Sequence, residues 1–109
     1  MIEEYIMQEI TSIDELTEVV NNNKEVVIDL FAHWCSPCQE MLPVVTEIAE
    51  SAPVPFYKID IDKVPEAKKF TGAKAIPMII MYKEGRVREF AFGITPREKI
   101  EQKMNRLFK

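Results

Sequence analysis

The only two cysteines of this chain, Cys35 and Cys38, flank Ser36-Pro37 in the stretch HWCSPCQEMLP. Two thiols at this spacing are compatible with a structural disulfide, part of a metal site, or a redox centre. A disulfide across this spacing closes almost no loop, so it would constrain the unfolded chain very little. A structural zinc site usually needs four Cys or His ligands, and the chain offers only His33 besides the cysteines. The pattern therefore favours thiol–disulfide chemistry without a metal.

A helix is predicted from Ser36 to about residue 50. Its apolar positions recur at helical spacing, at Met41, Leu42, Val45, Ile48 and Ala49. At a helix start, backbone N–H groups lack partners and the macrodipole is positive, and both effects favour thiolate over thiol. We therefore expect Cys35 to be exposed and to attack a substrate disulfide, while Cys38, deeper, attacks the resulting mixed disulfide. Pro37 suits the first turn because its missing N–H needs no partner.

Three further residues are candidates for the same site. Trp34 offers a flat apolar surface beside the thiols, unless its indole belongs to the core. Asp29 interrupts the apolar run VVIDLF, where burial raises the pKa of a carboxyl and lets it carry a proton during exchange. Lys58, on the strand expected alongside, would moderate that shift. The alternatives are a polar residue tolerated near a strand end for Asp29 and a solvated surface lysine for Lys58.

Alternating strands and helices are predicted to position these residues. Strands are expected around Tyr5 to Met7, in EVVIDLFA and in VPFYKIDID. The continuous apolar run of the second strand is typical of a strand covered on both faces. TSIDELTEVV begins a helix at which Ser12 and Glu15 form a capping box. PEAKKF is expected to form a short helix that ends at Gly72.

The C-terminal third is predicted to continue with a hairpin and a helix. PMIIMYKEGRVREFAFG divides at Glu84-Gly85 into two β runs. TPREKIEQKMNRLF begins a helix with Thr95 as N-cap and Glu98 completing a capping box. The order is therefore β-α-β-α-β-α-β-β-α. It implies one α/β domain over residues 1–109, with a central mixed five-stranded sheet and helices on both faces.

The composition argues against several classes of protein. The 109 residues carry a formal net charge of -4, which disfavours nucleic acid and anionic membranes as partners. The N-terminus MIEEYIMQEI lacks the positive region and the long apolar region of a secretory signal. No apolar stretch approaches the roughly 20 residues needed to cross a bilayer. We therefore expect a cytoplasmic protein, and in a reducing cytosol two close cysteines are more often catalytic or metal-binding than structural.

These motifs, taken in order, resemble the thioredoxin family from about Ser12 to Phe108. VVIDLFAHWCSPCQEMLPVV is similar to the family's strand, active-site turn and helix, and KIDID is similar to its third strand. AIPMIIMYKEGRV resembles the family's cis-proline loop and hairpin, and Gly93 resembles the glycine after the last strand. The resemblance implies the thioredoxin fold and the reduction of protein disulfides by dithiol–disulfide exchange.

The resemblance also implies the roles of individual residues. Cys35 becomes the nucleophile, Cys38 the resolving cysteine and Asp29 a buried proton carrier with Lys58 as its neighbour. The implied substrate-binding residues are Trp34, Ser36, Pro37, Ala75, Ile76, Pro77 and Gly93. The resemblance implies a cis peptide bond before Pro77, whereas sequence alone predicts trans.

The partners implied by the resemblance lie outside this chain. The implied electron donor is an NADPH-dependent, flavin-containing thioredoxin reductase, and the acceptors are disulfide-containing proteins. No flavin or nicotinamide motif lies in the chain, so no bound cofactor is expected beyond the Cys35–Cys38 couple itself. The chain is expected to be a monomer.

The sequence departs from the family pattern around the thiols. Ser36 replaces the usual glycine between the cysteines, and Phe31 replaces a common tryptophan. Ala75 and Met78 replace a common glycine and a common threonine beside the proline loop. His33 stands where an acidic residue is frequent and is expected to be a solvent-exposed spacer rather than a positive charge near the thiols. Two alternative functions stay open: a disulfide oxidase or isomerase, and a thioredoxin-fold binding module within a larger complex.

Overall fold

The computed structural model describes residues 7–108 of the chain, and their helices and strands alternate as the sequence predicts. The elements are β1 (Met7–Ile10), α2 (Ile13–Asn22), β2 (Glu25–Phe31), α3 (Ser36–Ser51), β3 (Phe56–Asp60), α4 (Glu66–Thr71), β4 (Met78–Lys83), β5 (Arg86–Phe92) and α5 (Arg97–Leu107). The first strand was expected around Tyr5 to Met7, and of that range only Met7 lies within the described residues. The described part of the strand extends to Ile10, in register with β3.

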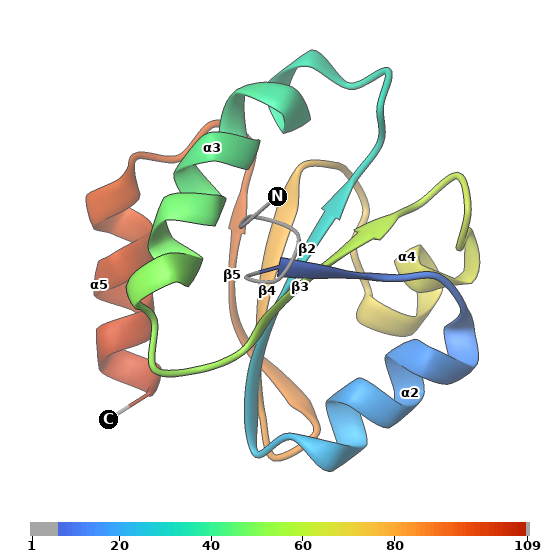
Figure 1. Cartoon of the computed structure of the whole chain (residues 1–109), viewed down its shortest axis with the longest axis horizontal. Coiled ribbons are helices and arrows are strands. Elements are labelled where there is room, and N and C mark those ends of the chain that lie inside the picture. Colours follow the sequence, from blue (N-terminus) through green and yellow to red (C-terminus); the bar gives the residue numbers. More distant parts are fainter. Residues whose placement is uncertain (1–6, 109) are drawn as a thin grey trace.

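The five strands form one mixed sheet in the order β1-β3-β2-β4-β5 (Figure 1). β1, β3 and β2 are parallel, whereas β4 is antiparallel to both β2 and β5. β2 lies at the centre, and every residue from Val26 to Phe31 is buried, as its continuous apolar run predicts. The α/β class, the mixed five-stranded sheet and the order of its elements are therefore confirmed.

The sheet carries a hydrophobic core on each face. One core joins Val27 of β2 to residues of α3 and α5, and the other joins Ile28 to residues of α2 and α4. In Figure 1, α3 and α5 lie together on one side of the sheet and α2 and α4 on the other. Because side chains alternate along a strand, Asp29 shares the α3 face with Val27 and Phe31. No helix within residues 7–108 is long and apolar enough to cross a membrane.

The predicted helix caps are only partly correct. The Ser12 hydroxyl accepts a hydrogen bond from the Glu15 N–H at 3.1 Å, as a capping box requires. The Glu15 carboxylate returns to the N–H of Thr11 at 2.8 Å. The prediction that Thr95 caps the last helix is wrong. α5 begins at Arg97, and the Thr95 hydroxyl instead donates to carbonyl oxygens of the preceding turn.

Glycines end α4 and turn the hairpin as predicted. Gly72 adopts a left-handed conformation at the C-terminus of α4, with φ of 80°. Glu84 and Gly85 have φ of 55° and 80° between β4 and β5. Two consecutive positive φ angles are typical of the tight turn that matches the twist of a hairpin.

Candidate active site

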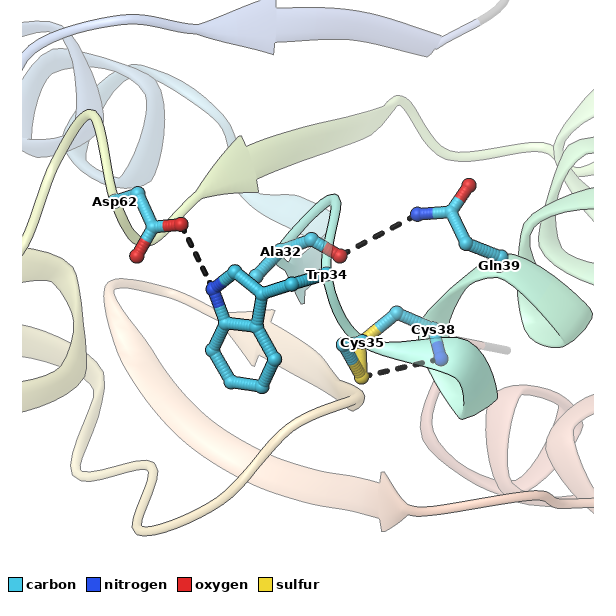
Figure 2. Close-up of a disulfide and its surroundings, with 6 residues drawn as sticks. All are labelled: Ala32, Trp34, Cys35, Cys38, Gln39 and Asp62. Atoms are coloured by element: carbon cyan, nitrogen blue, oxygen red, sulfur yellow. Dashed lines mark hydrogen bonds between the residues drawn. A yellow bond between two sulfur atoms is a disulfide. The ribbon is translucent and has the colours of Figure 1, made fainter.

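Cys35 and Cys38 form a disulfide at the N-terminus of α3, with their Cα atoms 5.2 Å apart (Figure 2). Cys35 occupies the N-cap position, and its Sγ accepts a hydrogen bond from the Cys38 N–H at 3.3 Å. Pro37 lies in the first turn of the helix. The prediction that both thiols lie at a helix start is confirmed, and the partner of the Cys35 sulfur is one of the N–H groups that a helix leaves unpaired.

The expectation that Cys35 is exposed is wrong for the closed disulfide. Its exposed fraction is 5%, against 2% for Cys38. Both cysteines belong to a small hydrophobic cluster with Phe31 and Ala32, against which Ile61 and Ile76 pack. These neighbours come from β2, from the loop after β3 and from the loop before β4, so the fold encloses the pair from three directions.

A surface groove of about 530 Å³ distinguishes the two cysteines, because Cys35 lines it and Cys38 does not. Five other predicted site residues line this groove, namely Trp34, Ser36, Pro37, Ala75 and Ile76. We call it the Cys35 groove. Ile61 and Lys68 also line it and were not predicted, because they belong to other parts of the chain that only the fold brings beside the thiols.

Pro77 and Gly93 are joined by a backbone hydrogen bond next to the loop that lines the Cys35 groove. The Ile76–Pro77 peptide bond is cis, as the resemblance implies. Pro77 is buried, and its carbonyl oxygen accepts a hydrogen bond from the Gly93 N–H at 2.9 Å. Neither residue lines the groove. The bond ties the loop that carries Ala75 and Ile76 to the end of β5.

Trp34 is the most exposed large apolar side chain among residues 7–108, with an exposed fraction of 69%. The alternative of a core indole is therefore wrong. Its Nε1–H donates a hydrogen bond to Asp62 Oδ2 at 2.9 Å (Figure 2). Asp62 was not predicted as a site residue. The bond fixes one edge of the ring while its faces stay accessible, which suits a surface for a substrate chain.

His33 is more than the exposed spacer that was predicted. Its side chain is 73% exposed, but Nε2 lies 3.4 Å from Oδ2 of Asp60, whose side chain is buried. The imidazole also packs edge-on against Phe31, with ring centroids 5.3 Å apart. His33 therefore anchors the turn before the cysteines to the end of β3.

Asp29 is buried on the α3 face of β2, with an exposed fraction of 2%. Burial raises the pKa of Asp29 from its ordinary value of 3.8 to about 7, and the charge of Lys58 lowers it in part. Oδ1 accepts no hydrogen bond from the described part of the chain. The predicted rise of the pKa and the moderating effect of Lys58 are both confirmed. A carboxyl with this pKa exchanges protons near neutral pH.

Lys58 is the register partner of Asp29 on the adjacent strand β3. It is half-buried and lines a second cavity together with Gln39, Leu42 and Pro43 of α3. The alternative of a fully solvated lysine is therefore wrong. Lys58 lies outside the Cys35 groove, whereas Trp34, Ser36, Pro37, Ala75 and Ile76 line that groove together with Cys35.

No group of three or more His, Cys, Asp or Glu side chains within residues 7–108 is arranged to hold a metal ion. The site itself combines two sulfur atoms, a buried carboxyl and an apolar surface beside them.

The chain is similar to known proteins over nearly its whole length. Residues 8–106 match the family model described as Thioredoxin. A thioredoxin of Mycoplasmoides gallisepticum is 30% identical over 97 residues, which cover 88% of this chain and 97% of that relative. A thioredoxin of Malassezia sympodialis is 33% identical over 93 residues, covering 83% and 89% of the two chains. Oxidised mitochondrial thioredoxin 3 of Saccharomyces cerevisiae superposes with a TM-score of 0.85 at 27% identity, covering 95% of this chain and 98% of that one.

Proposed function

Because this chain belongs to the thioredoxin family and is a protein-disulfide reductase, we propose that Cys35 attacks substrate disulfides and that Cys38 resolves the product. The observation that supports this assignment most directly is that Cys35 lines the surface groove and Cys38 does not. The N-cap position supports it as well, since the Cys38 N–H and the positive end of α3 stabilise a negative charge on the Cys35 sulfur.

The proposed reaction begins with the reduced protein. The Cys35 thiolate attacks one sulfur of the substrate disulfide, and the other substrate sulfur leaves as a thiolate. The Cys38 sulfur then attacks Sγ of Cys35, which re-forms the Cys35–Cys38 disulfide and releases the second substrate thiolate. The substrate gains two electrons and takes up two protons, while the protein loses two electrons and its two thiol protons.

We propose that Asp29, with Lys58 beside it, accepts the proton of Cys38. Asp29 is ionised in about half of the molecules at a pH equal to its pKa of about 7. It can therefore accept the Cys38 proton before the second attack and release it to solvent afterwards, and it can supply a proton to the Cys38 thiolate when the disulfide is next reduced. Lys58 keeps the pKa of Asp29 from rising further.

The substrate is proposed to bind over Trp34, Ser36, Pro37, Ala75 and Ile76, which surround Cys35 in the groove. The loop before Pro77 offers backbone groups to an extended substrate segment, and the indole of Trp34 offers an apolar face. The hydrogen bond from the Gly93 N–H to the Pro77 carbonyl holds the end of this loop against the end of β5.

The remaining expectations concern partners and compartment. We propose that an NADPH-dependent thioredoxin reductase returns electrons to the couple, so that the chain itself needs no bound cofactor. We place the protein in the cytoplasm because a reductase needs a compartment in which thiols stay reduced. Residues 1–109 are proposed to form one domain that acts as a monomer. An oxidase or isomerase would share the fold but have a more oxidising redox potential. A binding module would also share the fold, but its active-site residues would be needed for partner binding and not for turnover.

The test uses two single-cysteine variants of the full chain and a disulfide-bonded protein substrate. Cys38→Ser should accumulate a mixed disulfide with the substrate, and Cys35→Ser should accumulate none. The opposite result would reverse the roles, and no trapping by either variant would reject the mechanism. The potential of the wild-type couple distinguishes the enzymes. A value near about -270 mV, typical of thioredoxin, supports the reductase, whereas a value toward about -120 mV supports an oxidase.

A further inference from the structure

A second groove, of about 420 Å³, lies beside the Cys35 groove and is lined almost entirely by apolar atoms. Its walls come from the segment after α4, which includes Ala73 and Ala75, and from Ile80 of β4 and Val87, Phe90 and Phe92 of β5. We call it the apolar groove. Phe90 and Phe92 are each about half exposed, at 52% and 55%. Two exposed phenylalanines in one groove are unusual for a protein that has no partner there.

The topology explains why this surface is uncovered. Phe90 pairs in register with Ile80, and Ile80 belongs to the core beneath α2 and α4. Side chains directly opposite each other on neighbouring strands share a face of the sheet. α4 ends at Thr71, and residues 72–77 continue without a helix. β5 is an edge strand, and its other face packs on α5 through Ala91. The core therefore continues onto β5 without a helix to cover it.

The apolar groove adjoins the Cys35 groove, since Ala75 lines both of them. Phe92 is the register partner of Met78, the residue that follows the Ile76–Pro77 bond. A substrate segment that lies beside Cys35 and crosses Ala75 therefore reaches the aromatic side chains of β5.

The charges at the junction favour an acidic segment. Lys68 lines the Cys35 groove and Lys74 lines the apolar groove. Both lysines are exposed, and neither forms a salt bridge with a carboxylate among residues 7–108. The Asp62 carboxylate beside Trp34 of the Cys35 groove is engaged by the indole N–H, whereas these two lysines have no carboxylate partner among residues 7–108.

We propose that the apolar groove is a second substrate-binding site. It takes an aromatic or large aliphatic side chain of a protein substrate, carried on a segment that also bears carboxylates and that flanks the disulfide attacked by Cys35. The proposal rests on the proposed attack by Cys35, since that reaction places the substrate at the shared Ala75 wall. The apolar groove then selects among disulfide-containing proteins, while the Cys35 groove holds the substrate sulfur that Cys35 attacks.

The test measures how fast the reduced full-length protein reduces a set of disulfide peptides. In the set, a phenylalanine is moved through each position on either side of the disulfide, and each peptide has a twin with serine at that position. At the position that reaches the groove, we expect the phenylalanine peptide to react about tenfold faster, since partial burial of a phenyl ring stabilises the complex. Phe90→Ser should reduce that ratio to about one.

Phe70 provides the matched control, because it is an exposed phenylalanine on α4 that lines neither groove. Phe70→Ser should keep the tenfold ratio. Lys74→Gln should reduce the preference for peptides with Asp beside the phenylalanine over peptides with Lys there. Equal rates for phenylalanine and serine peptides at every position, or equal losses in Phe70→Ser and Phe90→Ser, would overturn the proposal.

Two further measurements distinguish this proposal from its alternatives. Reduction of a small hydrophilic disulfide without aromatic or large aliphatic groups reports on Cys35 alone, so its absence would indicate failure of the proposed mechanism rather than of the groove. Sedimentation of the wild-type protein over a range of concentrations tests whether a second copy covers the groove. A dimer that Phe90→Ser dissociates and Phe70→Ser leaves intact would overturn the assignment to a substrate.

Discussion

Asp29 and Lys58 are direct register partners on the neighbouring parallel strands β2 and β3. One is fully buried and the other is half-buried at a cavity beside α3. Burial favours the neutral form of Asp29, and the charge of Lys58 favours the ionised form. The pKa of about 7 is the balance of these two effects, and removal of either one should move it.

Removal of the Lys58 charge should raise the pKa of Asp29. In Lys58→Met, only the desolvation effect remains, so the pKa should rise above about 7. NMR titration of the Asp29 carboxyl carbon measures this directly. Lys63→Met is a suitable control, because Lys63 is an exposed lysine of the same region that pairs with Glu9. A titration midpoint that is the same in Lys58→Met and the wild type would remove Lys58 from this role.

Asp29 should also make the folded protein less stable as the pH rises. Its folded pKa of about 7 lies above the ordinary value of 3.8, so the folded state binds more protons between these values. Stability is therefore fully present below about pH 4, falls as the pH rises through about 7, and is then lower by about 4 kcal/mol.

Asp29→Asn removes the titrating group and should remove this part of the pH dependence. Urea unfolding of the oxidised wild type and variant at several pH values measures the difference between their stabilities. The variant should gain stability relative to the wild type as the pH rises toward 8. Parallel stability profiles would show that burial does not raise the pKa of Asp29.

The fold and the inner part of the site were predictable because local patterns determine them. The unbroken apolar run of β2 indicated a central strand, and a carboxyl within that run had to be buried with a raised pKa. The position of the cysteines after this strand indicated a helix N-terminus. These inferences need only the periodicity of a segment and its neighbours in the chain.

The outer part of the site depends on contacts between distant segments and was not predictable in the same way. Asp62 reaches Trp34, and Asp60 reaches His33, only after β3 is placed beside β2. Acids and isoleucines alternate in KIDID, so they are expected on opposite faces of a strand. The alternation does not show which residues the acids contact. The burial of Cys35 likewise depends on Ile61 and Ile76, which approach it from two other segments.

Gly72 should be required for its backbone conformation alone. Its φ of +80° is unfavourable for residues with a side chain, yet a Cβ built there meets no atom within 4 Å. Gly72→Ala should therefore cost about 1 kcal/mol of stability, and Gly72→Asn should cost less because asparagine tolerates this region better. Thermal or urea unfolding of the two variants tests the order. Equal stability of Gly72→Ala and the wild type would contradict it.

The hydrogen bond between Trp34 and Asp62 should hold the exposed indole in a fixed orientation. Trp34 is the only tryptophan of the chain, so its fluorescence reports on this ring alone. Asp62→Ala removes the acceptor and should increase the fast motion of the indole in time-resolved anisotropy, while an exposed bond of this kind changes global stability by no more than about 1 kcal/mol. Asp62→Asn keeps an oxygen acceptor and should restore most of the order. If the ring is equally rigid in Asp62→Ala and the wild type, packing rather than this bond orients Trp34, and the reduction of protein substrates should then be unaffected by the loss of Asp62.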